Sequence, residues 1–88
     1  MSDADRRSER RHPSRGPLKL SFDDPSPQEI TGQLMDCSMN GFRAIHAYVA
    51  LHTGQVVDFR HAVADGKARV MWNRIAGDRV ETGFFVIR

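Results

Sequence analysis

The chain has 88 residues, with 13 Lys and Arg against 11 Asp and Glu, which gives a formal net charge of +2. A chain of this length forms one small domain with a modest core and little room for a deep catalytic cleft. No apolar run approaches the roughly 20 residues of a membrane-spanning helix, and the polar start lacks the apolar centre of a signal peptide. The single cysteine excludes an internal disulfide. We therefore expect a cytoplasmic binding module rather than an enzyme or a membrane protein.

The positive charge is confined to the leading segment. Residues 1–16 hold an excess of arginine over acid, whereas bases and acids balance in the remainder of the chain. The first residues contain almost no apolar side chains, so their burial cannot offset the entropy lost on ordering. We expect residues 1–14 to form a flexible arm and residues 15–88 to form the folded domain.

Alternating apolar and polar residues predict a series of short strands separated by turns. The expected strands, in chain order, are 16–22, 29–38, 41–50, 55–63, 67–75 and 79–88. Asp65-Gly66 and Gly77-Asp78 carry the residues favoured in two-residue hairpin turns. Six such strands in a small chain favour an all-β antiparallel barrel, because closure removes exposed edges. The residues expected in its core are Leu18, Leu20, Leu34, Ile45, Val57, Phe59, Val70, Trp72, Phe84 and Val86.

The leading segment contains the spacing Arg-x-x-x-Arg at Arg11 and Arg15. The same spacing occurs at residues 6/10 and 7/11, so by itself this pattern is typical of a solvated basic tail. Arginine nevertheless has a specific chemistry. Its guanidinium forms paired hydrogen bonds to phosphate and to the O6/N7 edge of guanine, and it stacks on purine rings.

A second pattern, Asp-x-Ser-x-x-Gly, lies where the second expected strand ends. Asp36 and Ser38 project to the same face of a strand, and Gly41 permits a backbone bend that a Cβ would hinder. A carboxylate complements the paired donors N1–H and N2–H₂ of guanine, while a hydroxyl and turn amides suit a phosphate. Alone, the pattern favours a simple turn capped by its own side chains. Together, the two patterns indicate a ligand that contains guanine and phosphate.

The two motifs together resemble the signature of the PilZ domain family. Members of this family are bacterial receptors for the second messenger cyclic di-GMP. In that family an Arg-x-x-x-Arg segment precedes the barrel, and Asp/Asn-x-Ser-x-x-Gly follows after a spacer. The resemblance selects Arg11 and Arg15 as the arginine pair, because this pair abuts the first strand. It covers residues 9–88, and it extends to the segments 69–72 and 82–85, which are similar to the family's last two strands.

The resemblance implies a six-stranded PilZ-like barrel with little or no C-terminal helix, since the chain stops where many members continue into one. It also implies a non-catalytic receptor whose arm changes conformation on binding cyclic di-GMP and so regulates a partner protein of unknown identity. An arginine at position 10 favours an intercalated pair of ligand molecules. No cofactor or metal is implied. The implied ligand-binding residues are Arg10, Arg11, Arg15, Asp36, Ser38 and Gly41.

Two other functions remain open. One is a small barrel that binds nucleic acid through its basic arm, against which the balanced charge of residues 17–88 argues. The other is a PilZ-like protein-interaction module that does not bind nucleotide. An enzyme is not expected, because no nucleophile with a base and no set of metal ligands can be assembled. We interpret Trp72 as a core residue and Cys37 as a small buried one, and we assign no chemistry to His46, His52 and His61.

Overall fold

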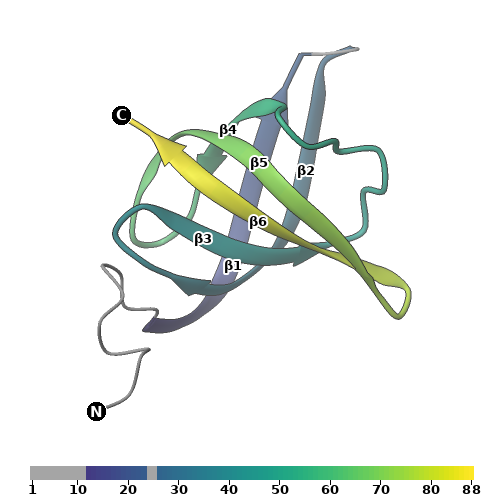
Figure 1. Cartoon of the computed structure of the whole chain (residues 1–88). Helices are drawn as coiled ribbons and strands as arrows, with labels where there is room; N and C mark the ends of the chain where they lie inside the picture. Colours follow the sequence, from purple (N-terminus) through teal and green to yellow (C-terminus); the bar gives the residue numbers. More distant parts are fainter. Residues whose placement is uncertain (1–11, 24–25) are drawn as a thin grey trace.

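The computed structural model of the chain describes residues 12–23 and 26–88, with side chains described from Ser14 onward. These residues form six strands, joined by turns and loops (Figure 1). No helix in the described part of the chain is long and apolar enough to span a membrane. The strands are β1 (His12–Phe22), β2 (Gln28–Cys37), β3 (Gly41–His46), β4 (Val56–Arg60), β5 (Asp65–Ala76) and β6 (Arg79–Ile87).

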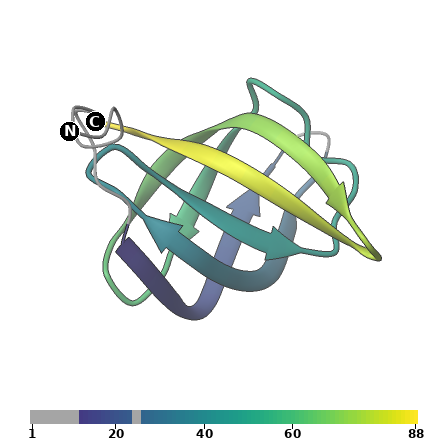
Figure 2. The same cartoon turned by 60° about the horizontal axis from the view of Figure 1, so that its bottom comes forward.

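The strands close into a barrel in the order β1-β2-β3-β6-β5-β4, and all neighbours are antiparallel. The expectation of a six-stranded antiparallel barrel is therefore confirmed. Closure depends on a short pairing of β1 with β4, in which Lys19–Ser21 lie opposite Asp58–Arg60. The start of β1, the β2–β3 turn, the β4–β5 turn and the end of β6 gather at one end of the barrel (Figures 1 and 2). We call this the motif end.

The core lies inside the barrel and is built from alternate residues of every strand. At its centre Phe42 stacks on Phe84 with ring centroids 4.6 Å apart and tilts against Phe59 at 4.8 Å. Most of the residues expected in the core are buried, whereas Ile45 and Val86 are half-buried. The buried apolar residues are Leu18, Leu20, Phe22, Leu34, Phe42, Ala44, Leu51, Val57, Phe59, Ala68, Val70, Val80 and Phe84.

Trp72 does not belong to the core, so its interpretation as a core residue is wrong. The register of β5 against β6 shifts between Val70 and Trp72, and Trp72 lies opposite Gly83. Such a bulge inserts one residue and changes the side to which the following side chain points. Trp72 is 39% exposed on the outer wall, and its indole occupies the space above Gly83, where a Cβ would overlap the ring.

The two predicted hairpin turns have different outcomes. Gly77-Asp78 is a two-residue turn, with Ala76 opposite Arg79 and a left-handed φ of +67° at Gly77. The other prediction is wrong, because residues 61–64 make the β4–β5 turn, closed by the His61 N–H to the Ala64 carbonyl at 2.9 Å. Asp65 and Gly66 already belong to β5. Gly66 pairs with Phe59 and has a φ of +148°, which a residue with a side chain rarely adopts.

A chain of hydrogen bonds at the end of the barrel opposite the motif end leads from the buried side chains of His46 and Thr82 to the exposed Asn73. His46 is 1% exposed; its Nδ1 accepts from the Tyr48 N–H at 3.1 Å, and its Nε2 lies 2.7 Å from the Thr82 hydroxyl. That hydroxyl donates to Asn73 Oδ1 at 2.6 Å, and Asn73 Nδ2 donates to the Leu51 carbonyl at 3.1 Å. Because Nδ1 accepts and the hydroxyl donates onward, the proton of a neutral His46 lies on Nε2. Burial lowers the pKa of His46 below its ordinary value.

This burial predicts a loss of stability in mild acid. The unfolded chain takes up a proton at His46 near pH 6.5, whereas the folded chain takes it up only at a lower pH. The folded state therefore has its full stability above pH 6.5, and this stability declines as the pH falls below that value. Urea unfolding should show a lower free energy of unfolding at pH 5 than at pH 7.5. Burial also lowers the pKa of His61, so His61 contributes to the same decline in stability. The variant His61→Gln should therefore retain part of it, and a pH-independent stability in that variant would contradict the role of His46.

Candidate functional site

The residues that the sequence singles out lie at the motif end, as far as the structure describes them. Arg10 and Arg11 lie outside the described residues. Arg15 is an exposed residue of β1, within a register shift between Pro13 and Gly16. Asp36 lies near the end of β2 directly opposite Pro13, and Ser38 and Gly41 flank the β2–β3 turn. Arg15 and the Asp-x-Ser-x-x-Gly motif are thus carried by adjacent strands.

A second register shift, in β2, determines where Asp36 points. Leu34 pairs with Ala44, and both side chains are buried in the core. The next pair is Asp36 with Arg43, so Met35 is an extra residue that β3 does not match. Arg43 lies between the core residues Phe42 and Ala44 and therefore points to the outer wall. The bulge places the Asp36 carboxylate on the outer wall beside it.

Asp36 is held there by a charged partner. The Arg43 Nε donates to both carboxylate oxygens, at 2.9 Å and 3.2 Å, and its Nη2 makes a further ion pair with Oδ2. The other end of the guanidinium, Nη1, donates to Glu81 at 3.0 Å. These contacts, chiefly the hydrogen bond with Asp36, raise the pKa of Arg43. Arg43 is therefore fixed between two carboxylates that belong to β2 and β6.

The series continues to β5, where Arg74 forms an ion pair with the second oxygen of Glu81. Opposite charges thus alternate over four neighbouring strands, and we call this the ion-pair chain (Asp36, Arg43, Glu81, Arg74). Sequence reasoning did not single out this chain of ion pairs. Arg74 and Glu81 are equally far along the chain from the Gly77-Asp78 turn, so the register of a two-residue hairpin places them opposite each other. This pair could therefore have been predicted from the sequence.

The turn that carries Ser38 and Gly41 is tied to itself and to the last strand. The Ser38 N–H and hydroxyl both donate to the Gly41 carbonyl, at 2.8 Å and 3.3 Å. The Val86 N–H donates to the Asn40 carbonyl at 2.7 Å. Gly41 does not have a positive φ; it is required because a Cβ there would overlap the Phe84 carbonyl oxygen. Close approach of β3 to β6, rather than a bend, thus explains the glycine of the motif.

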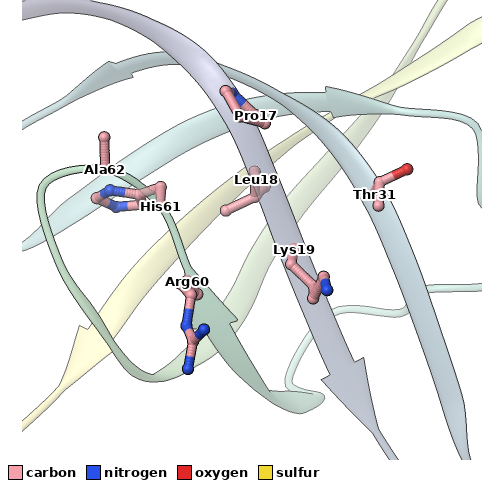
Figure 3. Close-up of a pocket in the computed structure, with 7 residues that line it drawn as sticks. All are labelled: Pro17, Leu18, Lys19, Thr31, Arg60, His61 and Ala62. Atoms are coloured by element: carbon pink, nitrogen blue, oxygen red, sulfur yellow. The ribbon is translucent and has the colours of Figure 1, made fainter.

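Two hollows lie near this end of the molecule. One has a volume of about 360 Å³ and opens between β1 and the β4–β5 turn (Figure 3). No motif residue lines it; its lining residues are Pro17, Leu18, Lys19, Thr31, Arg60, His61 and Ala62. A smaller one, of about 150 Å³, includes Asn40 and Gly41 of the motif together with Trp72 and Gly83. The smaller hollow adjoins the ion-pair chain, because Gly83 pairs with Arg43.

The described side chains do not form a metal centre. Residues 14–23 and 26–88 contain no group of three His, Cys, Asp or Glu side chains arranged to hold an ion. Cys37 packs against the core but is half-buried rather than buried as expected. The chemistry of this surface is therefore that of hydrogen bonds, ion pairs and an exposed aromatic ring.

Comparison with known proteins identifies the fold. No protein-family model matches the chain. No curated protein matches it either. Among solved structures, the chain is similar to YcgR from Escherichia coli in complex with c-di-GMP, with a TM-score of 0.71 and 16% sequence identity. The similarity covers 94% of this chain but only 38% of that one, so the chain corresponds to a minor part of YcgR.

The close contact at Gly41 predicts a cost for any side chain there. In Gly41→Ala the new methyl group would meet backbone rather than a movable side chain, so β3 and β6 must separate. We expect the free energy of unfolding to fall by about 1–3 kcal/mol, as for other overpacked sites. Urea denaturation measures this, with Met39→Ala as the control, because Met39 in the same turn is 74% exposed. Equal stability of the two variants would refute the close approach.

Proposed function

We propose that this chain is a PilZ-type receptor module for cyclic di-GMP and has no catalytic activity. The observation that supports this proposal is that Arg15, the described arginine of the first motif, lies on the strand next to the one that carries Asp36 of the second motif. Asp36 lies opposite Pro13 on β1, two residues before Arg15; Arg15 is exposed, whereas the Asp36 side chain is 11% exposed and lies against Arg43. The likeness of the fold to YcgR, whose solved structure is in complex with c-di-GMP, supports the same ligand.

The chemistry of the motif residues suits the two parts of this ligand. Arg15 offers paired N–H donors to a guanine O6/N7 edge or a phosphate. Asp36 offers acceptors to guanine N1–H and N2–H₂. Each carboxylate oxygen accepts more than one hydrogen bond, so a carboxylate held by Arg43 can still accept from a base. We assign Ser38 and Gly41 to the phosphate and ribose region.

The remainder of the site would come from the leading segment. Arg10 and Arg11 precede β1, and we assign both to ligand contacts, with Arg10 favouring a pair of intercalated ligand molecules. In this proposal residues 1–14 act as an arm, whose last three residues, 12–14, are also the start of β1, and residues 15–88 act as the barrel. Ligand binding shifts the arm toward a conformation in which it closes over the outer wall, which changes the surface offered to a cytoplasmic protein partner.

Calorimetric titration of the whole chain with cyclic di-GMP tests the proposal. We expect saturable binding, and Arg15→Ala should weaken it at least about 10-fold, since a hydrogen bond to a charged group contributes roughly 1.5–3 kcal/mol. Arg79→Ala is the matched control, because Arg79 is an exposed strand residue at the opposite end of the barrel. A folded protein that gives no heat with excess ligand would overturn the proposal. Binding that falls steeply with salt and ignores the base would instead indicate a nucleic-acid-binding barrel.

The choice of arginine pair has its own test. The Arg11/Arg15 pair predicts that Arg11→Ala weakens cyclic di-GMP binding about 10-fold or more, whereas Arg6→Ala changes it less than about twofold, since only a direct hydrogen bond carries the larger energy. Both variants remove one positive charge from the same segment, so general electrostatic attraction affects them alike. Equal losses in the two variants would show that the motif pair is a different one.

A further inference from the structure

We propose that Glu81 and Arg74 are positioning residues of the cyclic di-GMP site, which fix the carboxylate of Asp36 through Arg43 and thereby set the preference for guanine over adenine. This inference rests on the proposed function. Neither residue belongs to the two sequence motifs, and they lie on β6 and β5, whereas the motifs lie on β1, β2 and β3. Their link to Asp36 exists only in the folded barrel.

Glu81 is the centre of the argument, because a carboxylate is rarely buried without paired charges. Its side chain is only 3% exposed, and its two oxygens contact different arginines, Arg43 at 3.0 Å and Arg74. The side chain of Arg74 is 66% exposed, so this ion pair reaches the surface. The two ion pairs of Glu81 therefore offset the cost of desolvating its carboxylate. They also hold two guanidinium groups in fixed places on the outer wall.

Arg43 transmits this constraint to Asp36. A free arginine side chain has many rotamers, and fixing it costs up to about 2 kcal/mol of conformational entropy. Here the planar guanidinium is held at both ends, by Asp36 through Nε and Nη2 and by Glu81 through Nη1. With only one end held, Arg43 and Asp36 could turn together as a pair. Glu81 removes that freedom, and the plane of the Asp36 carboxylate is thereby set.

The orientation of that plane matters for base selection. Guanine presents two adjacent donors, N1–H and N2–H₂, which a carboxylate accepts as two parallel bonds only when the two planes coincide. The corresponding edge of adenine has one donor and one acceptor, so it cannot make the same pair of bonds. A fixed carboxylate therefore favours guanine, whereas a mobile one loses part of the two-bond advantage.

Paired titrations with cyclic di-GMP and cyclic di-AMP test the inference. In Glu81→Gln we expect the affinity ratio between the two ligands to fall about 10-fold, which corresponds to one lost hydrogen bond of about 1.4 kcal/mol. Arg74→Gln should lower the ratio by a smaller factor, because Glu81 keeps its contact with Arg43. Lys67→Gln is the control: Lys67 is on β5 like Arg74, its exposed ion pair with Asp58 of β4 lies outside the ion-pair chain, and its loss should leave the ratio unchanged.

The ratio separates positioning from stability. A purely structural loss lowers the folded fraction and weakens the binding of both ligands by the same factor. It therefore does not change the ratio of the two affinities. If Glu81→Gln does not fold, the surface variant Arg74→Gln still provides the test. Wild-type binding with guanine preference, together with an unchanged ratio in every variant that folds, would overturn the positioning role and leave the receptor function standing. Failure of the folded wild type to bind either ligand would overturn both.

Discussion

A strand in the wall of a closed barrel points its side chains alternately to the core and to the outside, and this alternation constrains where polar groups can stand. Asp36 follows the core residue Leu34 by two positions, so an unbroken β2 would aim its carboxylate into the core. The register shift at Met35 avoids this and brings Asp36 to the outer wall beside Arg43. The ion-pair chain and the proposed ligand site both depend on that one extra residue.

Register shifts recur near the candidate site of this barrel. The shift in β1 surrounds Arg15, and the shift in β5 moves Trp72 outside, above Gly83. Bulges are common beside functional sites because they re-aim a side chain without a change in fold. In this barrel they place an arginine, a carboxylate and an aromatic ring on the outside, while Phe42, Phe84 and their neighbours fill the core.

The sequence predicts the six strands and their closure because these depend on alternation and turn residues, which are local. It predicts the Gly77-Asp78 turn for the same reason. The bulges are not predicted, because an alternating pattern assumes that no extra residue is inserted into a strand. Trp72 was assigned to the core for this reason. The contact of Arg43 with Glu81 joins residues far apart in the chain, and it requires the pairing of β3 with β6. The ligand contacts of Asp36, Ser38 and Gly41 stay predictions, because no bound molecule shows them.

The ion-pair chain contains two carboxylates and two guanidinium groups, so as a unit it has no net charge. The field of such an alternating row decays faster with distance than that of a single charge, and salt screens what remains beyond about 8–10 Å. An anionic molecule in solution would therefore be attracted by the arginines of the leading segment, which carry the chain's excess positive charge. The neutral ion-pair chain in the barrel wall acts on such a molecule only at short range. In the proposed receptor, long-range attraction of the anionic ligand and short-range recognition of its base would thus belong to different parts of the chain.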